Sequence, residues 1–141
     1  MITSSVTIID LGIGNLYSVS NAFSELGVSV SFAKDPLKVL QAEALVLPGV
    51  GSFAFAMGEL QRLNLVGPIK QTISNPSKKI LGICLGFQLM GLSSTEDGFT
   101  PGLALIPASV TAMRDDVPGS TEIPHIGFNT VESHRKAFTL E

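Results

Sequence analysis

Short apolar stretches alternate with helical patterns along most of this 141-residue chain. Four segments contain the short apolar runs of buried strands, namely "SVTIID", "VSVSFA", "ALVLPGVGSF", in which the strand runs into a glycine turn, and "KKILGIC". Helical patterns follow them in "NLYSVSNAFSEL", "DPLKVLQ", "FAFAMGELQRL", "NLVGPIKQTI" and "LGFQLMGLSS". This alternation predicts an α/β fold, a mostly parallel sheet flanked on both faces by helices with right-handed crossovers. We expect one domain over residues 1–141.

Helix-end signals support these assignments. Asn15 can cap the first helix and Gly27 suits the position after its end, while Asp35 and Pro36 suit the start of the second. An apolar stripe on the first helix is predicted to be buried; it comprises Leu16, Val19, Phe23 and Leu26. Past Gly98 the pattern changes to short β-like runs, "LALIP", "SVTAM" and "GFNTVE".

Composition excludes several classes of function. The net charge is −3 and the nine Lys and Arg residues are scattered, so we expect no nucleic-acid or membrane partner. No apolar run approaches the ~20 residues that span a bilayer, and the N-terminus lacks signal-peptide features. One cysteine and two histidines give neither a disulfide framework nor zinc-ligand spacing. We expect a cytoplasmic protein without metal or cofactor.

Three glycine loops are predicted at the carboxyl edge of the sheet, where ligands of parallel sheets bind. In "LGIGN", Gly12 and Gly14 begin like a dinucleotide fingerprint, but Tyr17 occupies the third glycine position, which favours a structural turn. "PGVGSF" alone also reads as a turn that ends a strand. "GICLG" contains the third glycine loop and the only cysteine, Cys84.

Cys84 lies in a G-x-C-x-G pattern that predicts a nucleophile elbow, a sharp strand-to-helix turn carrying a reactive side chain. Gly82 and Gly86 would leave room for the turn. A helix starting near Leu85 would favour the thiolate, and backbone N–H groups there could stabilise an oxyanion. The alternative is a buried, inert cysteine, which is common. The spacing favours the nucleophile.

"GICLGFQLM" resembles the nucleophile motif of class I glutamine amidotransferases, and "LPGVGSF" resembles their oxyanion segment. With "IIDLGIGNLYSVSNAF", "GLALIPASV" and "IPHIGFNTV", the order is similar to that of the glutaminase subunit of imidazole glycerol phosphate synthase. Leu11 and Phe128 depart from that pattern, where Tyr and Trp are common. The resemblance implies a flavodoxin-like fold.

The resemblance also implies a reaction. Cys84 would attack the side-chain amide of glutamine and form a thioester, with N–H groups of Gly51 and Leu85 holding the oxyanion. Gly49, Gly51, Gln88 and Glu96 would bind the substrate. Without the resemblance, Gln88 reads as a polar helix residue and Glu96 as a solvated loop acid.

By the same resemblance, ammonia would pass to a (β/α)₈-barrel cyclase in a heterodimer that forms imidazole glycerol phosphate for histidine biosynthesis. The residues near that interface would be Asn15, Pro124, Ile126, Phe128 and Asn129. Read without it, the segment from Pro124 to Asn129 is an ordinary turn.

The family activates its cysteine with an H-x-E pair near the C-terminus. Only His125 and His134 occur here, and neither fits that pattern. We therefore expect a domain incomplete at its C-terminal end, an exposed sheet surface, and poor glutamine hydrolysis by these residues alone. Three alternatives stay open: a glutaminase subunit of another synthase, for example in surface-sugar biosynthesis, a catalytically deficient interaction subunit, and a related elbow-bearing cysteine hydrolase.

Overall fold

The computed structural model describes residues 5–112, 128 and 130. Its centre is a four-stranded sheet in the order β2-β1-β3-β4, formed by β1 (Ser5–Ile9), β2 (Ser29–Ala33), β3 (Ala44–Gly49) and β4 (Lys79–Cys84). Each neighbouring pair in this sheet is parallel. A small antiparallel pair follows, β5 (Ser93–Ser94) with β6 (Thr100–Pro101). The predicted α/β class with a mostly parallel sheet is confirmed.

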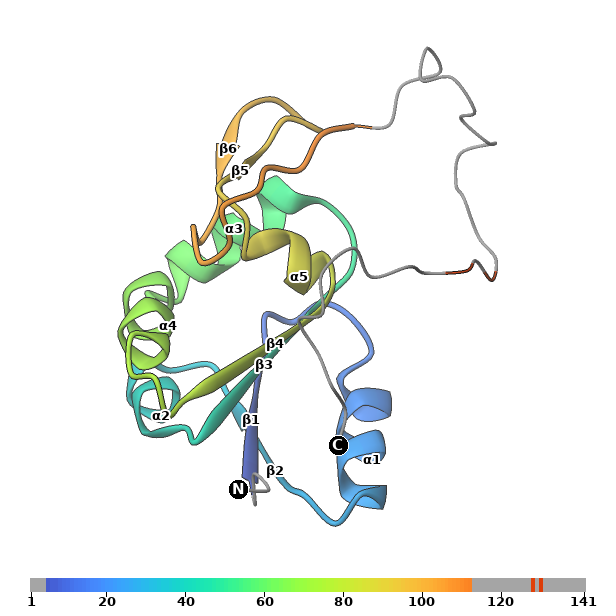
Figure 1. The fold of residues 1–141 in the computed structure, drawn as a ribbon, viewed down its shortest axis with the longest axis vertical. Coiled ribbons are helices and arrows are strands. Elements are labelled where there is room, and N and C mark those ends of the chain that lie inside the picture. Colours follow the sequence, from blue (N-terminus) through green and yellow to red (C-terminus); the bar gives the residue numbers. More distant parts are fainter. Residues whose placement is uncertain (1–4, 113–127, 129, 131–141) are drawn as a thin grey trace.

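The helices cover the two faces of the sheet unequally. They are α1 (Leu16–Glu25), α2 (Pro36–Gln41), α3 (Phe53–Arg62), α4 (Val66–Ile73) and α5 (Leu85–Leu89). Figure 1 shows α1 alone on one side of the sheet and the other helices on the opposite side. Within the described residues, no helix is both long enough and apolar enough to cross a membrane.

The predicted starts of the first two helices are confirmed. The Asn15 side chain accepts a hydrogen bond from the Ser18 N–H (3.1 Å) and begins α1. Asp35 does the same for Lys38 (3.1 Å), ahead of Pro36 at the first position of α2. These caps satisfy N–H groups that have no acceptor inside the helix.

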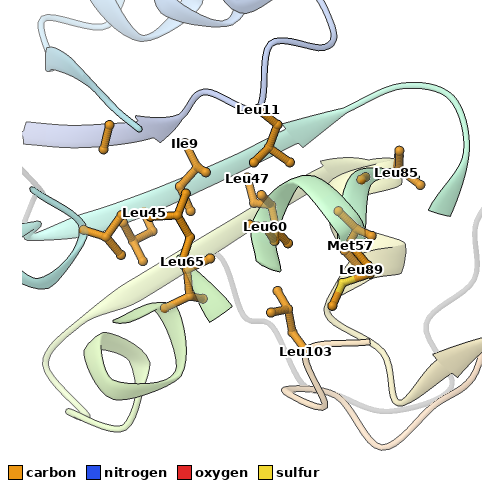
Figure 2. Packing of buried hydrophobic residues seen from close by; sticks show 14 of the residues in the cluster. Ile9, Leu11, Leu45, Leu47, Met57, Leu60, Leu65, Leu85, Leu89 and Leu103 are labelled. Atoms are coloured by element: carbon orange, nitrogen blue, oxygen red, sulfur yellow. The ribbon is translucent and has the colours of Figure 1, made fainter. Parts of the chain in front are cut away.

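The face covered by α2 to α5 holds the main core. Figure 2 shows leucines of β3, α3 and α5 packed together, with Leu103 closing the cluster from beyond β6. Its fully buried side chains include Phe53, Leu60, Leu65 and Leu89. Burying one such side chain stabilises the fold by about 1.5–3 kcal/mol.

The face covered by α1 is thinner. Its buried residues are Val6, Ile8, Ala44 and Val46, and α1 itself contributes only partly buried side chains. The prediction for Leu26 is wrong, because this side chain is 78% exposed at the end of α1. Burial of all strands is also wrong for β2 and β4, which are the two edges of the described sheet.

The chain after the fourth strand differs from the prediction. A helix was expected over residues 85–94, but α5 ends at Leu89, and "LALIP" forms no strand. Instead the N–H groups of Leu103 and Leu105 donate to the carbonyls of Leu89 and Met90, both at 2.8 Å. This segment satisfies the carbonyls at the end of α5, so both expectations fail for one reason.

Of the other β-like runs, "SVTAM" contributes an isolated bridge between Val110 and Ser94. "GFNTVE" lies outside the described residues except for Phe128 and Thr130.

Candidate active site

Cys84 ends β4 and immediately precedes α5. Its backbone has φ +53° and ψ −118°, and its side chain is exposed. A non-glycine residue with positive φ is uncommon and costs about 1–3 kcal/mol, so the surrounding structure must enforce it. The sharp strand-to-helix turn expected from the G-x-C-x-G pattern is therefore present, and it presents the sulfur to solvent.

Both glycines of the pattern are required by packing. A methyl group on Gly82 would lie 2.5 Å from the Phe87 Cα and 2.7 Å from the Met90 Sδ. A methyl group on Gly86 would overlap the carbonyl oxygen of Leu47 in β3. The first turn of α5 thus lies directly against β3 and β4, and this close approach holds Cys84 in its strained conformation.

The oxyanion segment lies beside the nucleophile. Gly49 is the register partner of Cys84 across the β3–β4 pair, and a methyl group on Gly49 would lie 3.3 Å from the Leu85 Cβ. Two residues later Gly51 has φ +95°, a conformation that favours glycine. The first glycine loop also reaches this place, since a methyl group on Gly14 would lie 3.9 Å from the Gly49 Cα. The three predicted loops therefore meet at one edge of the sheet.

Two backbone segments that carry N–H groups adjoin Cys84, the start of α5 and the Gly49–Gly51 turn. The N–H of Leu85, first residue of α5, has no acceptor within its own helix. Its side chain is buried, which fixes the backbone, and the Gly49–Gly51 turn supplies N–H groups from the neighbouring strand. Backbone N–H groups near a cysteine nucleophile can stabilise the negative charge that develops on a carbonyl oxygen when sulfur adds to it.

The two predicted substrate residues lie on different elements. Gln88 is half-buried on α5, one turn after Cys84. Glu96 is exposed between β5 and β6, where its N–H donates to the Ser94 Oγ (3.2 Å) and its Oε2 accepts from the same hydroxyl (3.4 Å). Because Ser94 is buried, its hydroxyl anchors both the backbone and the carboxylate of Glu96.

Sequence reasoning missed one polar contact near the site. The Ser52 hydroxyl donates to the Asp97 Oδ2 (2.9 Å) and accepts from the Phe55 N–H (3.3 Å) at the start of α3. The cap could have been recognised, because a serine precedes a helical pattern in "PGVGSF". The link to Asp97, 45 residues away, has no local signal.

The first glycine loop forms a turn. Gly12 and Gly14 have φ +73° and +87°, and the Gly12 N–H donates to the Asp10 Oδ1 (2.8 Å). Within the described residues no group of three or more His, Cys, Asp or Glu side chains gathers as a metal site would require.

The predicted partner-side residues are only partly described. Asn15 is exposed, with its side-chain oxygen used by the cap of α1, and Phe128 is fully exposed. Pro124, Ile126 and Asn129 lie outside the described residues, as do His125 and His134.

Comparisons with known proteins identify a family and relatives of this chain. Residues 7–139 match the family "Glutamine amidotransferase class-I". The chain is 46% identical over 132 residues to "Imidazole glycerol phosphate synthase subunit HisH 1" of Legionella pneumophila (strain Lens), covering 92% of this chain and 62% of that relative.

Two solved structures share the fold at 18% identity. "Crystal structure of glutamine amidotransferase" has a TM-score of 0.66 and covers 75% of this chain and 55% of that one. A putative peptidase E from Listeria monocytogenes EGD-e has a TM-score of 0.61, with 74% of this chain and 63% of that chain covered.

Proposed function

This chain belongs to the class I glutamine amidotransferase family, and we propose that it carries the nucleophile, oxyanion turn and substrate-binding residues of a glutaminase. The observation that carries the proposal is the pairing of a strained, exposed Cys84 with Gly49 of the glycine turn. Strain of this kind is retained where a side chain must be held in a reactive position. The chain spans 62% of the length of its Legionella relative, and the proposal concerns this part of such a protein.

The chemistry follows from the positions of the donors. The Cys84 thiolate attacks the side-chain amide carbon of glutamine, a C–S bond forms, and the carbonyl electrons move onto oxygen. The N–H groups of Gly51 and Leu85 hold that oxyanion. When it collapses, the C–N bond breaks and the nitrogen leaves with a proton as ammonia. Water then hydrolyses the γ-glutamyl thioester, which releases glutamate and regenerates the thiol.

Substrate recognition is assigned to residues around the elbow. The Glu96 carboxylate suits the α-ammonium group of glutamine, and the Gln88 amide can both donate and accept. Gly49 and Gly51 allow the substrate to approach the backbone closely. The general base and the acid that orients it are assigned to chain outside residues 5–112, because that range contains no histidine.

For the acceptor of ammonia we propose a (β/α)₈-barrel cyclase that forms a heterodimer with this protein. The support is the name of the Legionella relative, a subunit of imidazole glycerol phosphate synthase. Asn15 and Phe128 are exposed, as interface residues must be before a partner binds. Direct transfer avoids protonation of ammonia, which would remove its nucleophilic lone pair. Pro124, Ile126 and Asn129 are assigned to the same interface.

The test is to trap the thioester. The protein is incubated with glutamine, quenched in acid and analysed by intact-mass spectrometry, and we expect a γ-glutamyl adduct on Cys84. Asparagine, one methylene shorter, is the matched control and is expected to give none. The Cys84→Ala variant is the second control.

An adduct that persists in Cys84→Ala, or equal labelling by asparagine, would contradict the assignment. Unchanged synthase activity of Cys84→Ala with the cyclase would favour a non-catalytic interaction subunit instead.

A further inference from the structure

Two loops around the nucleophile are joined by one side-chain contact. The turn that carries Gly51 continues into Ser52, and the loop that carries Glu96 continues into Asp97. The Ser52 hydroxyl donates to the Asp97 Oδ2 at 2.9 Å. Gly51, expected to hold the oxyanion, therefore adjoins the donor of this hydrogen bond, and Glu96, expected to bind the substrate, adjoins its acceptor.

Ser52 is fixed by a second contact. Its oxygen accepts the Phe55 N–H at 3.3 Å, so its hydrogen points to the carboxylate while its lone pair caps α3. Phe53, the first residue of α3, is 1% exposed and anchors the helix in the main core. Asp97 is thus tied through Ser52 to a rigid element, whereas the turn itself has backbone at φ +95° and lies exposed.

The loop that carries Asp97 depends on this hydrogen bond because few of its residues are buried. Glu96, Asp97 and Gly98 are all exposed, and Gly98 has φ +89°. Before Glu96 in the chain, the Ser94 hydroxyl accepts a hydrogen bond from the Glu96 N–H. After Glu96, the Asp97 carboxylate accepts a hydrogen bond from Ser52. Loss of either hydrogen bond would let Glu96 move relative to the Gly49–Gly51 turn.

We propose that Asp97 is a positioning residue that, through Ser52, fixes the oxyanion turn and the Glu96 loop relative to Cys84. The inference rests on the proposed glutaminase function and deepens it. Asp97 does not touch the substrate. It sets the geometry in which Gly51 and Glu96 act, and small misplacements of such groups reduce rates by large factors.

The test measures how fast a chloromethyl ketone analogue of glutamine alkylates Cys84 in the whole protein, at mildly alkaline pH. Labelling that is saturable and blocked by glutamine establishes the glutamine site. Iodoacetamide, which needs no substrate site, reports whether the thiol itself is unchanged. We expect Asp97→Ala to lower the maximal labelling rate by the ketone about tenfold and to leave the iodoacetamide rate unaltered.

Three variants separate positioning from simple destabilisation. Asp97→Asn retains an oxygen acceptor for Ser52, so it is expected to recover most of the rate. Ser52→Ala combined with Asp97→Ala is expected to be no slower than the slower single variant, because both act through one hydrogen bond. Asp35→Ala removes a comparable helix cap at α2, an element that contributes to neither of the two joined loops, and is expected to leave both rates unchanged.

The outcomes distinguish the two proposals. Wild-type labelling that glutamine does not block would overturn the glutaminase assignment itself. Glutamine-protected labelling with Asp97→Ala equal to wild type would overturn only the role of Asp97. So would a parallel fall in the iodoacetamide rate, since that would mean a general loss of structure.

Discussion

The two faces of the sheet are built from the same strands, yet they differ in how tightly they are covered. On one face β1 and β3 pack against four helices, and the resulting core contains Leu45, Leu60 and Leu89 with almost no exposure. On the other face α1 is the only described helix that covers the strands, and no residue of α1 is buried. The candidate active site is built by the first arrangement, in which α5 lies directly on β3 and β4.

The α1 face retains open apolar surface. A hollow of about 370 Å³ lies between α1 and β4 and is lined entirely by apolar side chains. Two of these, Leu26 and Leu81, are 78% and 50% exposed. A closely packed site and an open apolar surface thus occur on one small sheet, so the close packing around Cys84 is reached with one face densely covered.

The largest effect is expected for Gly86→Ala on the dense face. The new methyl group would overlap the carbonyl of Leu47, and neither backbone can move away without separating α5 from β3. We expect a loss of about 4 kcal/mol or more in the free energy of unfolding, measured with urea. Gly58→Ala in α3 is the matched control, because nothing lies within 4 Å of its added methyl group. It should stabilise the protein by about 0.5–1 kcal/mol.

A leucine pair compares the two faces directly. Leu60→Ala removes a fully buried side chain from the main core and should cost about 3 kcal/mol. Leu26→Ala removes a side chain that is mostly exposed at the end of α1 and should change stability by less than about 0.5 kcal/mol. Equal losses for both variants in urea denaturation would show that the α1 face is as tightly packed as its opposite.

The strain at Cys84 gives a smaller effect. Cys84→Gly and Cys84→Ala both remove the thiol, but only glycine adopts φ +53° without steric cost. After the greater chain entropy of glycine in the unfolded state is taken into account, we expect Cys84→Gly to be about 1 kcal/mol more stable than Cys84→Ala. Thermal unfolding of the two variants side by side measures the difference. An Ala variant as stable as the Gly variant would mean that the elbow is relaxed.

The smallest effect on stability, and a visible one on association, is expected for Leu81→Lys. This side chain lies beside the open hollow on β4, an edge strand of the sheet formed by the described residues, where a charge should reduce self-association and dye binding. The free energy of unfolding should change by less than about 0.5 kcal/mol. Leu37→Lys is the control, since Leu37 is 69% exposed on α2, away from the hollow. Light scattering that falls equally in both variants would rule out a specific role of this surface.

Local signals predicted much of the fold because the relevant interactions are local. Asn15 and Asp35 cap helices through N–H groups three residues ahead, and the first three strands and helices start and end close to the predicted residues. The elbow at Cys84 could be predicted for the same reason, since its glycines are two residues away on either side.

The failures occur where distant residues decide the structure. The helix expected over residues 85–94 ends early because Leu103 and Leu105 bind its last carbonyls, and no periodicity in the sequence encodes that contact. Leu26 belongs to a correct apolar stripe, but its burial depends on what else covers the face. The Ser52–Asp97 hydrogen bond joins two loops 45 residues apart, so the sequence could not predict that these two loops of the site are connected.

The close contact between Gly86 and Leu47 also has a kinetic meaning. Amide protons of β3, which pairs with β1 on one side and β4 on the other beneath α5, can exchange with solvent only when the main core opens as a unit, whereas those of α1 need only local opening. The reactive sulfur is thus exposed to reagents directly beside a strand that exchanges slowly. In hydrogen–deuterium exchange, the exposed Cys84 should have one of the best protected backbone segments, β3, as its neighbour.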